Sequence, residues 1–409
     1  MERVDKLIST FLRRRFKLKL STVYSKLRSD LLQDMERVRC NLCDSDQSVE
    51  IAHKDKYDLA ITTVMCRNCG LMYLNPRPTT RAYDRFYSEG GSKEGVYHMS
   101  LGLDNVEGIL KRYYGPEFQM SELDAQDLEN FVREKYTEHL GEKSGERPIN
   151  ELLQGLEAKA REFEAWRYDV YAEDIYRHFQ DVVPRGGKVF EIGAAAGQLL
   201  LPWRDRHGCE VTGLEPRKAT VEAAKVRSGI DLFQGFPSTA DIPKNAYDAV
   251  LIIRTINHMI DPLSDLRHAW RWIKPGGVLI VDISDAFREA KYEGFENNVV
   301  EIDHTYMFSA ATLKAMMQKA GYEFVRCDIV DTRHVWWGDR RELQFKQIRM
   351  VGRKSLQPVA IEWPDPLGEL AELVKAQLAR EESLLTRDTK PKERSSSCMV
   401  RRRRSRICR

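Results

Sequence analysis

Four cysteines in two close pairs are the feature that most constrains how the N-terminal part of this chain can fold. They form the segments Cys40-Asn41-Leu42-Cys43 and Cys66-Arg67-Asn68-Cys69, and Gly70 follows the second. Two such turns place four thiolates at the corners of a tetrahedron, the coordination that Zn²⁺ adopts in structural sites. Because four sulfur ligands leave no open position for water or substrate, we predict a structural zinc ion bound by Cys40, Cys43, Cys66 and Cys69. The ion would stabilise a module too small for a sizeable core of its own.

Thiolate ligands require a reducing compartment, and the rest of the sequence favours one. The first 20 residues are too basic and interrupted for a secretion signal, and we expect no transmembrane segment because no apolar run approaches the roughly 18 residues that cross a bilayer. A chain of 409 residues with 42% hydrophobic residues can form two or three domains, each with a core. We therefore predict a cytoplasmic globular protein, a monomer or a homodimer, with reduced cysteines.

The net charge of +3 is the sum of two basic terminal segments and an acidic central segment. Residues 1–39 hold 11 Lys and Arg against 5 Asp and Glu, and residues 390–409 hold 9 against 1, which leaves −11 for residues 40–389. A body of that charge repels a polyanion, which argues against nucleic acid as a partner. The basic ends would allow at most a weak peripheral contact with a membrane surface.

From Lys188 the pattern changes to short apolar strands that alternate with amphipathic helices. This alternation is typical of an α/β fold with a parallel sheet covered on both faces. The strands are expected at 188–192, 210–214, 231–233, 249–253 and 278–283, with a final pair at 324–331 and 345–351. The helices are expected after Gly197, Pro216, Pro262 and Ser309.

The first of these strands runs into the small-residue loop Gly193-Ala194-Ala195-Ala196-Gly197. Such a loop between a strand and a helix lets the backbone approach a ligand closely. Ala195 and Gln198 stand where a nicotinamide-binding G-x-G-x-x-G sequence requires glycine, so a dehydrogenase is disfavoured. Glu191, ahead of the loop, suits an α-amino group, and Glu215, at the end of the next strand, can accept hydrogen bonds from both hydroxyls of a ribose. These features indicate a nucleoside that carries an amino acid.

The segment 188–351 resembles the class I S-adenosylmethionine-dependent methyltransferases. The resemblance rests on the acid-Gly-x-small-x-Gly loop, on Glu215, on Tyr247-Asp248 and on Ile273-Lys274-Pro275-Gly276-Gly277. With the four cysteines and the following Gly70-Leu71-Met72-Tyr73-Leu74-Asn75-Pro76-Arg77-Pro78-Thr79, residues 40–351 look like the zinc-ribbon subgroup associated with nucleotide-sugar and surface-glycan methylation. The resemblance implies a doubly wound, seven-stranded, mostly parallel sheet whose last strand, 345–351, is antiparallel.

Together these features predict five parts of the chain. They are a basic N-terminal helical segment (1–39), a zinc ribbon (40–80), a helical connecting or lid region (81–183), an S-adenosylmethionine-binding methyltransferase domain (184–354) and a C-terminal helix with a basic disordered tail (355–409).

The resemblance also implies which residues bind S-adenosylmethionine. They would be Glu191, Gly193, Ala195 and Gly197 on the methionine side, Glu215 at the ribose, Gln234 to Phe236 near the adenine, Arg254 and Thr255 beside the methionine and sulfonium, and an aromatic segment at Tyr97 and His98, or else Tyr87, over the cofactor. Alanine at 195 is tolerated if its φ is negative, but its methyl group narrows the approach of the backbone to the cofactor.

Methyl transfer from a cationic sulfur requires a base when the acceptor starts protonated, as sugar hydroxyls and carbons next to a ketone do. His304 is the predicted base, because the sugar C-methyltransferases that this chain resembles carry an acid-His pair at the matching place. Asp303 would orient or stabilise its imidazole. His258, beyond the fourth strand, is a second candidate for contact with substrate. The alternative for each histidine is a structural role in packing or in capping a helix.

Three functions remain open at this point. The first is methyl transfer to a hydroxyl or activated carbon of a nucleotide-linked sugar or related glycan precursor. The second is RNA methylation, in which the ribbon and the basic ends would bind the RNA. The charge of −11 over residues 40–389 disfavours this function. The third is a noncatalytic scaffold that binds S-adenosylmethionine, which the alanine-rich loop leaves open.

Overall fold

A seven-stranded sheet forms the centre of the structure, a computed structural model that describes residues 31–55, 59–89, 170–293, 295, 299–335, 342–375 and 378. Its strands are β6 (Lys188–Ile192), β7 (Glu210–Glu215), β8 (Leu232–Gln234), β9 (Tyr247–Ile253), β10 (Ile273–Ser284), β12 (Tyr322–Val335) and β13 (Glu342–Lys354). They lie in the order β12-β13-β10-β9-β6-β7-β8. Strands β6 to β10 are parallel, whereas β13 pairs antiparallel with both β10 and β12. The predicted α/β fold with a seven-stranded, mostly parallel sheet and an antiparallel last strand is confirmed, whereas the zinc ribbon and the helical insert stay predictions.

Both faces of this sheet are buried, as the continuous apolar strands predict. Along β9 the side chains of Val250 and Ile252 join the core on one face, and those of Ala249, Leu251 and Ile253 join the core on the other. This alternation follows from the two-residue period of a strand. The first face is covered by α9 (Pro262–Trp272) and α11 (Ala310–Lys319), and the second by α7 (Leu201–Asp205) and a helical stretch at residues 170–179.

The helices begin where local sequence signals place them. Helix α9 starts at Pro262, and the side chain of Asp261 accepts a hydrogen bond from the Ser264 N–H. Helix α11 begins after Ser309, which forms a reciprocal capping box with Thr312. Helix α8 (Lys218–Ser228) ends at Gly229, and the short helix η3 (Gln198–Leu200) follows Gly197. Polar N-caps and a glycine at the C-cap satisfy backbone groups that the helices leave free.

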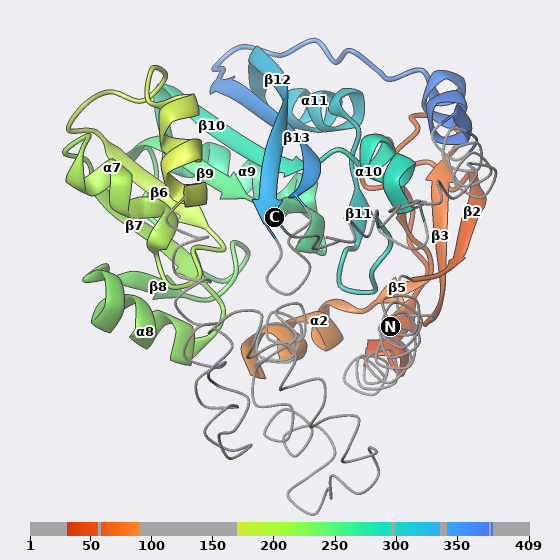
Figure 1. Ribbon diagram of the computed structural model, residues 1–409, viewed down its shortest axis with the longest axis horizontal. Coiled ribbons are helices and arrows are strands. Elements are labelled where there is room, and N and C mark those ends of the chain that lie inside the picture. The colour runs from red at the N-terminus through yellow and green to blue at the C-terminus, as the bar shows by residue number, and fades with distance from the viewer. Residues whose placement is uncertain are drawn as a thin grey trace, which may run out of the picture.

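The cysteine-containing part forms a separate small sheet. Its elements are β1 (Met35–Glu36), β2 (Ser48–Lys54), β3 (Ala60–Cys66), β4 (Met72–Leu74), β5 (Arg77–Pro78) and α2 (Thr80–Glu89). The four-stranded sheet has the order β11-β4-β3-β2, and its edge strand β11 (Tyr306–Met307) lies in the sequence between β10 and β12 of the larger sheet. Figure 1 shows β2 and β3 beside β11, on the side of the molecule away from β7 and β8. The sequence did not predict this shared sheet.

Much of three predicted segments lies outside the described residues, namely 1–30, 90–169 and 379–409. The basic N-terminal segment, the greater part of the connecting region and the basic tail therefore stay predictions. Within the described part, α2, the stretch 170–179 and the stretch 366–375 are helical as expected. In those described residues, no helix combines the length and the apolar character needed to cross a membrane.

A buried ion pair joins β10 to β13 near the carboxyl end of β10. Asp282 and Arg349 face each other in register and are 0% and 2% exposed. The Arg349 Nε donates to the Asp282 carboxylate at 2.9 Å, and its guanidinium also contacts Asp174. The hydroxyl of Tyr171 donates to the other Asp282 oxygen, which links residues 170–179 to the sheet. Burial raises the pKa of Asp282, and the charge of Arg349 opposes that rise.

We predict that Arg349→Met destabilises the protein by about 3 kcal/mol or more, because it leaves Asp282 as a buried charge without its principal counterion. Urea unfolding would measure the loss. Arg353→Met is the matched control, since Arg353 lies on the same strand but is exposed, and its replacement should cost less than about 0.5 kcal/mol. Equal free energies of unfolding for the two variants would contradict the prediction.

Candidate active site and zinc site

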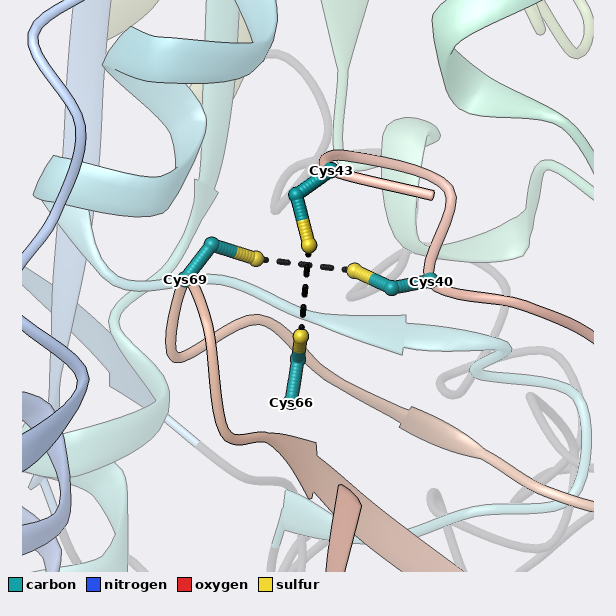
Figure 2. Close-up of side chains that lie close together, drawn as sticks. All are labelled: Cys40, Cys43, Cys66 and Cys69. Carbon is teal, nitrogen blue, oxygen red and sulfur yellow. Dashed lines mark hydrogen bonds between the residues drawn. The ribbon is translucent and has the colours of Figure 1, made fainter. Parts of the chain in front are cut away.

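The four predicted zinc ligands converge on one point. The Sγ atoms of Cys40 and Cys69 are 3.5 Å apart, those of Cys43 and Cys66 are 3.4 Å apart, and all four lie within 4.8 Å of one another (Figure 2). Tetrahedral Zn–S bonds of about 2.3 Å would place the sulfurs about 3.8 Å apart. The number, chemistry and spacing of the sulfur atoms therefore fit a zinc ion.

Gly70 closes the second cysteine turn in a conformation that suits glycine. Its φ is +72°, and its N–H donates to the Cys66 carbonyl at 2.9 Å. A Cβ atom at this position would lie 2.7 Å from the Cγ of Glu369, in the helical stretch 366–375. Gly70 thus allows both the turn and the close approach of the C-terminal helical stretch.

The loop predicted to bind the methionine part of the cofactor contacts Glu215, the residue predicted to bind the ribose. Glu215, at the end of β7, is 3% exposed, and its carboxylate accepts the N–H of Ala195 at 3.2 Å and that of Arg217 at 3.4 Å. Gly197 caps η3, and its N–H donates to the Ala194 carbonyl at 2.8 Å. Glu191 is fully buried on the neighbouring strand β6. The structure thus brings Glu191, Glu215 and the loop together at the carboxyl ends of β6 and β7.

Of the two residues expected at the methionine and sulfonium, Thr255 lies beside the same loop and Arg254 directly precedes Thr255 in the sequence. A Cβ atom on Gly193 would be 2.6 Å from the Thr255 side chain, so Thr255 can approach the loop only because residue 193 is glycine. Arg254 is exposed directly after β9, and its φ is +51°. Burial raises the pKa values of Tyr171 and Asp282, and the positive charge of Arg254 opposes that rise. The sequence reasoning did not single out Tyr171; an aromatic residue in the helical stretch ahead of the first sheet strand was the available signal.

The residues expected near the adenine flank Glu215 on its other side. Gln234 ends β8, pairs with Glu215 in register and is exposed. Phe236 follows after Gly235, whose N–H donates to the Glu215 carbonyl at 3.1 Å, and is half-buried. Tyr97 and His98 lie outside the described residues.

Ala195 departs from the expectation for the loop, because its φ is +48°. The sequence predicts that alanine is tolerated at position 195 only if its φ is negative. A non-glycine residue in the left-handed region carries roughly 1–2 kcal/mol of strain, and such strain is concentrated at functional sites. Ala195 is also the residue whose N–H reaches Glu215. The strained position therefore coincides with the contact between the loop and the predicted ribose ligand.

The two candidate histidines are in direct contact. His258 lies on η4 (Ile256–His258), just after β9, and His304 lies shortly before β11. Their ring centroids are 4.6 Å apart in an edge-to-face arrangement. Desolvation and the neighbouring His304 lower the pKa of His258 to about 4, so the His258 ring is neutral at pH 7.

A turn places a glutamate beside His304. The His304 N–H donates to the Glu301 carbonyl at 3.0 Å, and the Glu301 Oε1 lies 3.7 Å from the His304 Nδ1. Asp303, the expected partner, contributes a carboxylate within 4.8 Å of both groups, while its backbone carbonyl lies 2.9 Å from the His258 Nδ1. The sequence reasoning missed Glu301; its place three residues before His304, the span of a β-turn, was the signal.

Tyr87 adds a side chain from α2 to this cluster. It lies on α2, and its hydroxyl is 3.0 Å from the His258 Nδ1 and donates to the Asp303 carbonyl at 3.3 Å. Tyr87 was the sequence alternative to Tyr97 for an aromatic residue over the cofactor. The arrangement places the imidazole of His304 beside the carboxylate of Glu301, the combination of groups that general-base catalysis uses.

Comparison with known proteins agrees with this geometry. Residues 163–326 match the family model of a methyltransferase domain. The ubiquinone biosynthesis O-methyltransferase of Proteus mirabilis is 34% identical over 102 residues, which are 22% of this chain and 40% of that protein. The protein of the same name from Bradyrhizobium diazoefficiens is 29% identical over 100 residues, 24% of this chain and 39% of that protein. The chain thus spans about 40% of the length of these curated relatives.

Solved structures share a similar segment. An S-adenosylmethionine-dependent methyltransferase from Aquifex aeolicus is 17% identical, with a TM-score of 0.36, over 45% of this chain and 89% of that chain. One from Thermotoga maritima is 24% identical, with a TM-score of 0.36, over 48% and 95%. At these TM-scores the likeness supports no inference about function.

We predict that Ala195→Gly leaves the free energy of unfolding unchanged or raises it by up to about 1 kcal/mol, because relief of strain at positive φ offsets the extra freedom of glycine in the unfolded chain. Ala196→Gly is the control. Its φ is not positive, so the same exchange should cost about 0.5–1 kcal/mol. Chemical denaturation would measure both, and an equal loss in the two variants would refute the role of strain at Ala195.

Proposed function

Residues 163–326 match the model of a methyltransferase domain, and from that premise we propose that the chain transfers a methyl group from S-adenosylmethionine to a small acceptor molecule. The acceptor group is a hydroxyl or an activated carbon. Its class is a nucleotide-linked sugar or a related glycan precursor, for which the likeness of residues 40–351 to the zinc-ribbon subgroup is the support. The proposal places the protein in the cytoplasm.

The observation that carries the proposal is the meeting of two groups of residues near the carboxyl ends of neighbouring strands. Glu215 and the loop follow β7 and β6, while Thr255 and His258 follow β9. S-adenosylmethionine supplies a methyl group on a cationic sulfur. Glu215 would hold the ribose hydroxyls, and the fully buried Glu191 would accept the α-ammonium group. The acceptor would then bind beside the two histidines.

His304 would act as the general base. A hydroxyl acceptor gives its proton to the imidazole as its oxygen attacks the methyl carbon and the bond from that carbon to sulfur breaks. The Glu301 carboxylate, 3.7 Å from the His304 Nδ1, would stabilise the imidazolium that forms. Because His258 is neutral at pH 7, it would add no positive charge that opposes this protonation. The main contributions of the protein are then alignment of the acceptor, exclusion of water and removal of one proton.

A second candidate acceptor is a phenolic hydroxyl. The curated relatives are named for O-methylation in ubiquinone biosynthesis. A phenol loses its proton with a pKa near 10, as the side chain of Tyr does, so the same histidine would serve it as base. RNA as the acceptor remains disfavoured by the charge of −11 over residues 40–389.

The decisive experiment is incubation with isotopically labelled S-adenosylmethionine and a panel of nucleotide sugars and phenols, with products identified by mass spectrometry. We expect Glu215→Ala to abolish cofactor binding in calorimetry, because the ribose loses its acceptor. His304→Ala should retain binding and lower kcat by about 100-fold or more, which is the usual contribution of a general base.

Two substitutions serve as controls. Glu210→Ala removes an exposed carboxylate from the same strand as Glu215, and His53→Ala removes an exposed histidine of the ribbon. Both should leave binding and turnover unchanged. Unaltered turnover in the His304 variant would remove this residue from the mechanism. Cofactor binding without methylation of any compound in the panel would favour the scaffold function instead.

We also propose that Cys40, Cys43, Cys66 and Cys69 bind a structural Zn²⁺ ion. Elemental analysis of the purified protein should then find one zinc per chain. Cys43→Ser should lose most of the metal, because a weaker oxygen ligand replaces a thiolate. Cys209→Ser is the control, since Cys209 is a buried cysteine that belongs to the other core. Retention of a full equivalent of zinc by the Cys43 variant would rule out this ligand set.

A further inference from the structure

Asn41 stands between two of the zinc ligands and reaches across to the methyltransferase domain. Its side-chain nitrogen donates to the Asp261 carboxylate at 2.8 Å, and its side-chain oxygen accepts the Leu263 N–H at 3.0 Å. Asp261 is the N-cap of α9, and the same carboxylate oxygen accepts the Ser264 N–H. The first cysteine turn therefore satisfies a backbone donor at the start of α9 that the helix itself leaves free.

Other ribbon residues hold the same region. The carbonyl of Leu42 accepts a hydrogen bond from Lys319, at the end of α11. Arg77 of β5 donates to the Ile260 carbonyl and to the Tyr306 hydroxyl, the latter at 2.8 Å. Tyr87 of α2 contacts His258 itself. Residues 258–263 are thus held from the ribbon side by three side chains, those of Asn41, Arg77 and Tyr87.

These contacts matter because the segment that carries His258 has little regular structure of its own. Helix η4 is a single 3-10 turn, and Met259 after it is extended. Short 3-10 turns have poor hydrogen-bond geometry and little stability alone. Asp261 lies three residues after His258, so a shift of the start of α9 would move the imidazole. Because His258 packs edge-to-face on His304, that shift would reach the proposed base.

We propose that Asn41 is a positioning residue: it transmits the geometry of the metal-bound first cysteine turn to the start of α9 and thereby sets the place of His258 and His304 on the acceptor side of the site. The inference rests on the proposed methyltransferase function. Metal binding and acceptor alignment are then linked through one amide side chain.

The test begins with Asn41→Ala in the full-length, zinc-loaded protein. We expect kcat/KM for the acceptor to fall tenfold or more, because small displacements of reacting groups are costly. The affinity for S-adenosylmethionine, measured by calorimetry, should change less than about twofold, and the zinc content should stay at one per chain. Asn68→Ala is the matched control, since Asn68 lies in the second cysteine turn with its side chain exposed. It should change none of these quantities.

An exchange of partners separates positioning from general destabilisation. Asn41→Asp alone places two carboxylates against each other and should be at least as damaging as Asn41→Ala. Combined with Asp261→Asn, it restores a donor and an acceptor with the roles reversed, and asparagine is as good an N-cap as aspartate. We expect the double variant to recover kcat/KM to within about threefold of the original protein. Failure of this rescue, with both proteins folded and zinc-loaded, would overturn the proposal.

A spectroscopic measurement makes the inference independent of the acceptor. The imidazole resonances of His258 in ¹⁵N-labelled protein should shift in Asn41→Ala, remain in place in Asn68→Ala, and return in the double variant. If these shifts occur but no acceptor is methylated, the proposed function fails and the positioning role stands. If the protein methylates an acceptor and the His258 resonances are identical in all variants, the positioning role is wrong and the function stands.

Discussion

The antiparallel pairing of β4 with β11 is the contact on which the arrangement of the two candidate histidines depends. Tyr73 pairs with Tyr306 and Met72 with Met307, and the Leu74 N–H donates to the Thr305 carbonyl at 3.0 Å. A strand of the cysteine-containing sheet thereby fixes the segment that leads directly from His304. The two parts are therefore not a catalytic domain with an appended module. They share a sheet, and the histidines lie where that sheet meets the carboxyl ends of the larger one.

Most of the larger sheet could be predicted because the determining signals are local. Strand β9 contains the unbroken apolar run 249–253 and β6 is mostly apolar, which suits burial on both faces, and α9 and α11 begin at Pro262 and after Ser309, where proline and a capping serine favour a helix start. Strand β11 could not be predicted. It has two residues and exists only through pairing with β4, which is distant in the sequence, so neither its length nor its composition identifies it.

The site shows the same division. The positions of Glu191 and Glu215 follow from strand ends, which the apolar pattern marks. The φ of Ala195 does not follow from residue type, because alanine ordinarily avoids positive φ and only the surrounding loop holds it there. The pairing of His304 with Glu301 depends on a turn. The sequence pattern pairs His304 with the adjacent Asp303, whereas the turn brings His304 together with a residue three positions earlier.

The cysteine turns give this arrangement a rigidity that the segment around His258 lacks. The proposed base, His304, packs on His258, and a single 3-10 turn holds His258 only weakly, so the constraint on both rings has to come from neighbouring elements. Four thiolates around the proposed zinc ion would fix the backbone of the first turn, and Asn41 within it makes two hydrogen bonds to the start of α9. A small zinc module with no open coordination position would thus affect chemistry without touching substrate. It would do so by fixing the residues that follow β9, whereas the large sheet positions only the strand itself.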